Sequence, residues 1–269
     1  MDGYYYGQKG KMGMQQSPYA APGIVHQLPP EVAQQAGSYQ LGEMNAVFRP
    51  TLTNPLTIIG LTIVALIADI LLTVVIYNVG YIVYVLVVLP VIIIIYCIRG
   101  LMTCNLRVYL FQNGFIHAKG SRLDVVRWDQ VRYIWQRITR SRYGNTTHHY
   151  KIERNDGATF TLNSMLKNVG ILGQNIQQAV TQVHLPQAIA AYNAGNAIPF
   201  GPLSISLQGL SNGREVLPWN QQQNLLLNRG YLLARRQGTS RNWAKVAVSR
   251  IPNYLVFIKL ANYARTGQV

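Results

Sequence analysis

Residues 55–77 read PLTIIGLTIVALIADILLTVVIY, and residues 81–98 read YIVYVLVVLPVIIIIYCI. Each run falls within the ~17–25 residues that an α-helix needs to cross a bilayer. A helix pairs its own backbone polar groups, which lipid cannot do, so both runs are predicted to be helical. Residues 78–80 alone separate them, enough for a tight reversal. We therefore predict a two-helix transmembrane hairpin within residues 42–102.

The competing interpretation is a pair of buried helices in a soluble core, but core helices seldom stay apolar on every face over 18 residues. Asp69 is the single charged residue in the 44 residues from Pro55 to Ile98. A carboxylate at this depth costs about 2.5–3.5 kcal/mol on insertion scales and is a functional candidate by default. Two roles stay open for it. A protonated Asp69 would donate a hydrogen bond to a carbonyl freed by Pro90, such as that of Leu86, or it would relay protons or ions between subunits.

The charge distribution predicts which side of the membrane the chain occupies. Residues 1–54 carry three basic and three acidic side chains, whereas residues 99–269 carry 21 basic and five acidic ones, a net charge of +16. Arg99 and Arg107 follow closely on the second apolar run, and positive flanks stay in the cytoplasm. We predict a multi-pass protein of the cell (inner or plasma) membrane with both termini in the cytoplasm.

Two further regions differ from the hairpin in composition. Residues 1–41 are rich in Tyr, Gln, Gly, Pro and Met without sustained periodicity, which predicts a disordered tail. From residue 103 the chain changes to short runs rich in β-branched and aromatic residues, as is typical of strands. Turn signals such as Asn155-Asp156-Gly157 separate these runs.

The strand-rich region is predicted to contain two units. Residues 103–195 read as strands followed by a helix that we expect to end near Pro186, and residues 196–269 read the same way, with Pro252 in the first turn of the closing helix. A shared signature supports a duplication. The paired residues are Gly114 with Gly209, Trp128 with Trp219, Asp129 with Asn220, and Gln130 with Gln221.

The strand, Gly-apolar, strand, Trp-[Asp/Asn] order resembles the pleckstrin-homology-like (PH-like) domains found behind membrane hairpins in bacteria. From Leu41 onward the chain is similar to an uncharacterised bacterial membrane-protein family of unknown function, in which the Leu217-Pro218-Trp219 and Ile251-Pro252-Asn253 segments recur. This resemblance implies an α+β membrane protein with tandem PH-like β units, each a small barrel closed by a C-terminal helix.

The sequence contains no motif for a catalytic site, a cofactor or a metal. It has no phosphate-binding or dinucleotide-binding glycine loop, no nucleophile elbow and no HExxH. Cys97 and Cys104 match no zinc or redox spacing. We therefore expect no enzyme, no cofactor and no resident metal.

The remaining clue is the basic charge, which has three interpretations. It reflects positive-inside bias and solubility, or contact with anionic inner-leaflet lipids worth ~1 kcal/mol per residue, or nucleic-acid binding. Tethering at the membrane already explains the charge, so nucleic acid is not an expected partner. The candidate anionic-lipid contacts are Arg99, Arg107, Arg235 and Arg236.

Three functional classes follow from these observations. The first, which we favour, is a membrane-anchored cytoplasmic interaction or scaffold module that binds a protein partner or anionic lipid headgroups. The second is a subunit of a homo-oligomeric transporter or channel that uses Asp69, because two spans cannot enclose a path alone. The third is an enzyme acting at the membrane surface, for which no residue is nominated.

Overall fold

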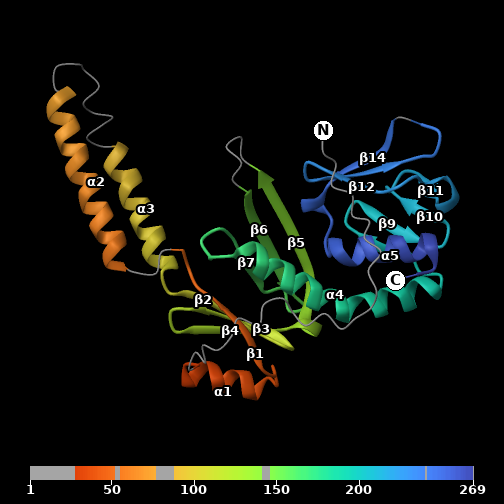
Figure 1. The fold of residues 1–269 in the computed structure, drawn as a ribbon, viewed down its shortest axis with the longest axis horizontal. Helices are drawn as coiled ribbons and strands as arrows, with labels where there is room; N and C mark the ends of the chain where they lie inside the picture. The colour runs from red at the N-terminus through yellow and green to blue at the C-terminus, as the bar shows by residue number, and fades with distance from the viewer. Residues whose placement is uncertain (1–27, 52–54, 77–87, 141–145, 240, 269) are drawn as a thin grey trace.

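The computed structural model describes residues 28–51, 55–76, 88–140, 146–239 and 241–268 (Figure 1). Within these ranges the chain combines helices with small antiparallel sheets, which confirms the predicted α+β class. A pair of apolar helices extends from one end of the molecule, and two β units lie along its long axis.

The first unit consists of two antiparallel sheets and a helix. The four-stranded sheet contains β1 (Met44–Phe48), β2 (Leu106–Phe111), β3 (Gly114–Lys119) and β4 (Arg122–Arg127), in that order. A short 3-10 helix, η2 (Trp128–Gln130), leads to the three-stranded sheet of β5 (Val131–Arg140), β6 (Thr146–Arg154) and β7 (Thr159–Leu162). The unit ends with α4 (Val169–Asn193).

The second unit repeats this order with shorter strands. Its four-stranded sheet contains β8 (Ile198–Phe200), β9 (Leu203–Ser206), β10 (Gly209–Ser211) and β11 (Val216–Pro218). After η3 (Trp219–Gln221), the three-stranded sheet contains β12 (Leu226–Asn228), β13 (Tyr231–Arg235) and β14 (Asn242–Ala247). The last elements are η4 (Val248–Arg250) and α5 (Tyr254–Thr266).

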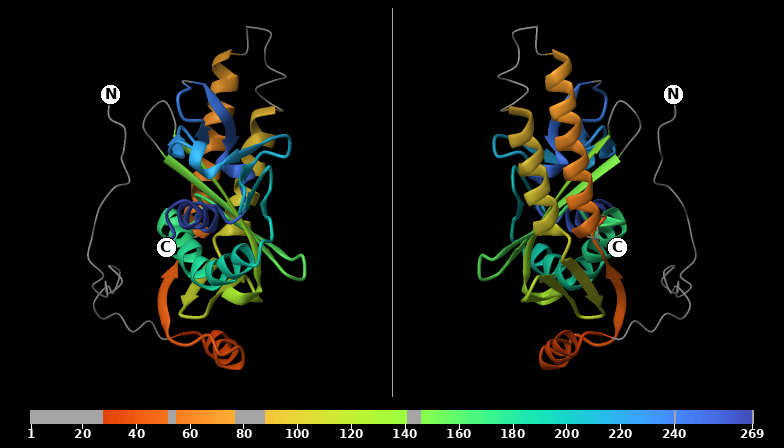
Figure 2. Two further views of the ribbon diagram at one scale, coloured as in Figure 1. Left: turned by 90° about the vertical axis from the view of Figure 1, so that its right-hand side faces the viewer. Right: turned by 90° about the vertical axis from the view of Figure 1, so that its left-hand side faces the viewer.

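Each unit has its own hydrophobic core, because strand alternation sends every second side chain inward. In β6, Tyr150 and Ile152 are buried while His149 and Lys151 are exposed. α4 closes the first core, and α5 closes the second with Phe257. Figures 1 and 2 show α4 and α5 side by side, so the closing helices join the two units.

The structure contains a helix where the sequence predicts a disordered tail. The helix α1 (Pro30–Ser38) lies within residues 1–41, so this part of the prediction is wrong, and residues 1–27 fall outside the described residues. Val32 and Ala36, one helical turn apart, are buried against the outer face of the first sheet beside Phe111 and Ile116. A nine-residue helix is marginal in water by itself. The sheet supplies the apolar partner that the sequence pattern could not reveal.

The position of β1 corrects the predicted start of the first unit at residue 103. β1 lies within residues 42–102, before the apolar helices, and pairs antiparallel with β2 so that Phe48 faces Val108. The helices α2 (Pro55–Ile76) and α3 (Leu89–Thr103) are therefore inserted between two neighbouring strands of one sheet. Pairing over long sequence separations is invisible to a local pattern, which explains the error.

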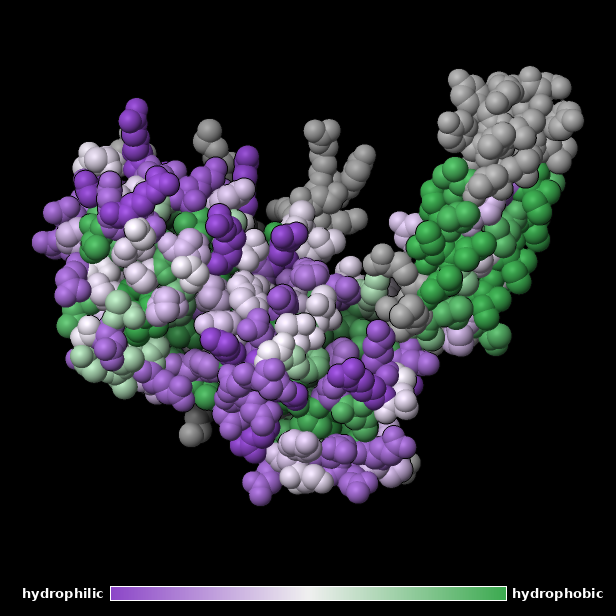
Figure 3. Space-filling model, turned by 180° about the vertical axis from the view of Figure 1, so that it is seen from behind, coloured by the Kyte–Doolittle hydropathy of each residue, from purple (hydrophilic) through white to green (hydrophobic). Residues whose placement is uncertain are grey.

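The structure contains one helix in its described parts that is long and apolar enough to cross a membrane, over residues 55–72 of α2. Only 11% of that window is buried. In α3 the apolar part is shorter and covers Leu89–Ile98. The first seven residues of the second predicted span, 81–87, lie outside the described residues. Figure 3 shows the hydrophobic surface of this helix pair standing clear of the polar β units.

Candidate functional site

The two tryptophans of the repeated signature occupy equivalent corners of the two units. Trp128 opens η2 and Trp219 opens η3, each directly after the fourth strand of its unit. The indole N–H of Trp128 donates to the carbonyl of Gln112 at 2.7 Å, and that of Trp219 donates to the carbonyl of Ser206 at 2.9 Å. Gln112 directly follows the second strand of its unit and Ser206 ends the second strand of the other, so each tryptophan connects the ends of the second and fourth strands.

The two glycines of the signature permit a close approach of neighbouring strands. A Cβ atom at Gly114 would lie 2.4 Å from the carbonyl oxygen of Val126, and one at Gly209 would lie 2.1 Å from that of Leu217. No side chain fits at either distance, which explains the glycine at both positions. The contacts of these glycines and tryptophans are structural, because they hold neighbouring strands together.

Asp69 lies in the interface between α2 and α3. Its side chain is 4% exposed. Ile58, Thr62 and Leu66, which are more buried than most other residues of α2, lie on the same face. Ile58 packs against Gly100 of α3. Counting eleven residues along each antiparallel helix from that contact leads to the same prediction as the sequence, that Asp69 lies level with Leu89. The carbonyl of Leu86, its predicted partner, lies outside the described residues.

The structure does not bring the four candidate arginines together. Arg99 lies in α3, and Arg107 is exposed in β2 beside the base of the helix pair. Arg235 ends β13, where its Nε donates to Asn242 Oδ1 at 3.1 Å, and Arg236 follows it in an exposed position. The β12–β14 sheet lies at the other end of the long axis from α3 (Figure 1). These residues form two separate basic regions.

Asn253 joins the two units and was not nominated as a site residue from the sequence. It precedes α5 with φ of +50°, a left-handed conformation that Asn tolerates well. Its Oδ1 accepts from the Ile134 N–H at 2.9 Å, its Nδ2 donates to the Arg132 carbonyl at 2.9 Å, and its own N–H donates to the Ile134 carbonyl at 2.9 Å. Two side-chain bonds and one backbone bond thereby join Asn253 to the edge strand β5. The sequence pointed to this residue only through the Ile251-Pro252-Asn253 segment that recurs in the similar family.

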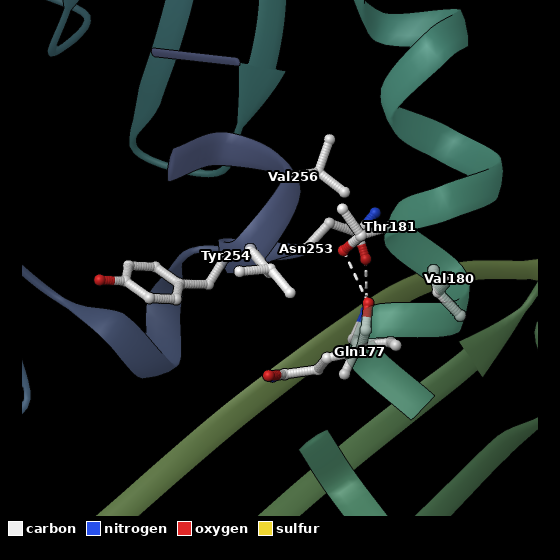
Figure 4. Close-up of a pocket in the computed structure, with 8 residues that line it drawn as sticks. Gln177, Val180, Thr181, Asn253, Tyr254 and Val256 are labelled. Carbon is white, nitrogen blue, oxygen red and sulfur yellow. Dashed lines mark hydrogen bonds between the residues drawn. The ribbon is translucent and has the colours of Figure 1, made fainter. Parts of the chain in front are cut away.

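Two hollows flank this junction. Figure 4 shows the smaller one, between α4 and the start of α5, where the Thr181 hydroxyl donates to the Gln177 carbonyl at 2.6 Å. It holds only about 10 Å³, less than a small ligand requires. The larger one is a groove of about 350 Å³ between the units. Its walls include Arg132, His184 and Phe200.

The groove has a defined polar and apolar lining. Asn155 stands at one side, where its Nδ2 donates to the Asp129 carbonyl at 3.4 Å. Burial lowers the pKa of His184, so its ring is uncharged near neutral pH. In the described residues, no group of three His, Cys, Asp or Glu side chains is placed to hold a metal ion.

Comparison with known proteins identifies a family without an assigned activity. The model of a family of unknown function, DUF6585, matches residues 12–269. This match confirms the predicted resemblance to an uncharacterised family. No curated protein and no solved structure matches the chain.

Proposed function

The chain belongs to DUF6585, a family of unknown function, and we propose that it is a membrane-anchored interaction module. In this proposal α2 and α3 form the membrane hairpin, and the two β units form a cytoplasmic platform for a protein partner or anionic lipid headgroups. The observation that carries the proposal is the exposed apolar surface of α2, inserted between two paired strands.

The energetics of α2 favour insertion in a bilayer. Large side chains such as Leu56, Val64 and Leu71 are at least 60% exposed in the isolated chain. Leaving apolar surface in water costs roughly 25 cal/mol per Å². A soluble core helix would be mostly buried, whereas α2 is not. Lipid is the environment that covers such a surface on all sides.

The strand pairing supports a hairpin with both ends on one side. β1 leads into α2, and α3 leads into β2, while Phe48 and Val108 face each other in the same sheet. A chain that leaves and re-enters one sheet at neighbouring strands has to return to the side from which it started. The net charge of +16 on residues 99–269 favours the cytoplasm for that side.

The topology of the units supports the PH-like assignment. Each unit has a four-stranded sheet, a three-stranded sheet and a closing helix in the same chain order.

The β12–β14 sheet and the far end of the β5–β6 hairpin lie on the side toward which α2 and α3 extend (Figures 1 and 2). Arg235 and Arg236 belong to that sheet region and are proposed to meet the inner leaflet.

The alternative function, a transporter or channel subunit, depends on the orientation of Asp69. A carboxylate shared between subunits would lie on the outer surface of the helix pair. Asp69 instead lies in the α2–α3 interface with 4% of its surface exposed. This burial favours a role within the hairpin over a relay between subunits.

Reporter fusions and lipid analysis test the proposal. Cytoplasmic reporters at both ends of the full chain should be active, whereas a reporter that is active only outside the cytoplasm should stay silent. Activity of this second reporter at either end would contradict the topology.

Lipid discs extracted around the full chain should be enriched in anionic lipid, and Arg235→Glu with Arg236→Glu should reduce the enrichment. The matched control is Lys119→Glu with Arg122→Glu in the β3–β4 turn, which should retain it.

A further inference from the structure

We propose that the groove between the two units binds a small soluble molecule that carries a phosphate or carboxylate group on an apolar body. This site is additional to the membrane contacts proposed above. Its walls come from β5, the loop after β6, the second half of α4, β8 and the start of α5. Ligand sites occur preferentially at such junctions between domains.

The size of the groove suits a small ligand. Its volume of about 350 Å³ lies within the ~300–1,000 Å³ that is typical of small-molecule sites. The three hydrogen bonds of Asn253 fix the two sides of the groove relative to each other. The groove is therefore preformed, and binding would not have to order its walls.

The side chains that line the groove define the chemistry of its ligand. Among the described residues that line the groove, Arg132 alone has a permanent charge, and none is Asp or Glu. Arg132 is exposed, and its guanidinium lies 5.1 Å from the centre of the Tyr133 ring. Its remaining donors suit the oxygen atoms of a phosphate or carboxylate. Gln187 and Asn155 add neutral polar groups beside it.

Another part of the lining is apolar. Exposed Pro199 and half-buried Ile198 of β8 belong to it. The buried residues of this part are Phe200, Pro252 before α5, and Val256 in the first turn of α5. Such a surface would contact a ring or a short aliphatic chain. An inorganic anion would leave this wall in water, which is why the ligand is expected to combine both features.

The location of the groove separates a soluble ligand from a lipid. Arg132 and Tyr133 lie at the start of β5, and this strand runs from there toward the side to which α2 and α3 extend (Figure 1). With the membrane position proposed above, the start of β5, which lines the groove, lies at the end of the strand away from the bilayer. We therefore expect the ligand to arrive from the aqueous phase.

Calorimetric titration of the full chain in discs of neutral lipid tests this site with phenyl phosphate. Phenyl phosphate should bind at least about tenfold more tightly than inorganic phosphate or benzyl alcohol. Arg132→Gln should weaken its binding at least about tenfold, because hydrogen bonds to charged groups are the stronger ones. Arg137→Gln, an exposed position on the same strand outside the groove, should leave its affinity unchanged.

A second variant keeps the test informative if loss of Arg132 disturbs folding. Ala188→Leu enlarges a side chain in the α4 wall and should block binding of phenyl phosphate without removing any charge. The proposal is wrong if phenyl phosphate does not bind, or if Arg132→Gln and Arg137→Gln weaken it equally. It is also wrong if discs of anionic lipid abolish binding, since a lipid headgroup would then occupy the groove.

Discussion

Replacing Asn253 by Gly should loosen the junction between the two units while leaving each unit folded. The substitution removes the acceptor for the Ile134 N–H and the donor to the Arg132 carbonyl, both at 2.9 Å. Glycine adopts the left-handed conformation of Asn253 without a steric penalty, so backbone strain does not contribute. The hydrogen bond donated by the backbone N–H of residue 253 is retained.

The size of the effect follows from the two lost hydrogen bonds. Each is worth about 0.5–1.5 kcal/mol net, which gives roughly 1–3 kcal/mol for the pair. Since about 1.4 kcal/mol corresponds to a factor of ten, local opening at β5 should become roughly 5- to 150-fold more frequent. Ile134 is 3% exposed, so its N–H has little access to water as a replacement acceptor.

Hydrogen exchange measured by mass spectrometry on the full chain in lipid discs provides the assay. The peptide that covers β5 should exchange faster in Asn253→Gly. Asn168 is the matched control, because it precedes α4 at the equivalent position with φ of +56° and makes no side-chain cap hydrogen bond. Asn168→Gly should leave exchange in β5 unchanged. Unchanged exchange in Asn253→Gly, or equal acceleration in both variants, would refute the role of this side chain.

Three further predictions concern the cores of the units. Gly173→Ala places a Cβ atom 2.1 Å from the Tyr150 ring and should cost about 1–3 kcal/mol in thermal unfolding, whereas Gly37→Ala, with nothing within 4 Å, should stabilise α1 slightly. Trp219→Phe loses a 2.9 Å hydrogen bond to the carbonyl that ends β9 and should cost ~1 kcal/mol by chemical denaturation. Burial lowers the pKa of His117 below 6.5, so as the pH falls the unfolded state takes up this proton before the folded state does. The free energy of unfolding should therefore decrease as the pH drops through 6.5, and His117→Gln should weaken this pH dependence.

The sequence predicts those features of the fold that depend on local pattern. The apolar run of α2 and the helix that follows the strands of the first unit are examples, because hydrophobic periodicity encodes both directly, the latter through Leu172, Ile176 and Val180 on one buried face. The paired Gly and Trp residues also predict the duplicated corners, because the contacts that the signature makes join neighbouring strands, with the two tryptophan hydrogen bonds spanning 16 and 13 residues of chain.

Features that depend on distant partners were missed. β1 is five residues long and pairs across the inserted helices, and α1 depends on the outer face of a sheet that comes later in the chain. The sequence also predicts an end of α4 near Pro186, which is too early. This proline lies inside the helix, which continues to Asn193 while its second half packs in the second core. Tertiary contacts there outweigh the loss of one backbone donor.

The candidate groove could not be predicted, because its walls come from both units and meet only in the folded chain. Arg132 is one of many basic residues in the sequence, and Pro199 resembles any loop proline. Asn253 alone carried a signal, through the Ile251-Pro252-Asn253 segment, without indicating β5 as its partner.

The insertion of the apolar helices between β1 and β2 suggests a variant in which they are removed. Residues 52–104 are replaced by a Gly/Ser linker of about ten residues, whose r.m.s. span is roughly 17 Å. β1 and β2 are both retained, whereas a fragment starting at Met102 would lose β1 from the sheet.

Density-gradient flotation after an alkaline, high-salt wash of membranes compares this linker variant with the full chain. Alkali and salt remove proteins held by charge alone, and aggregates sink rather than float. The full chain should float with the lipid, and the linker variant should stay in the aqueous fractions. Flotation of both proteins, or of neither, would contradict the account of α2 and α3 as the membrane anchor.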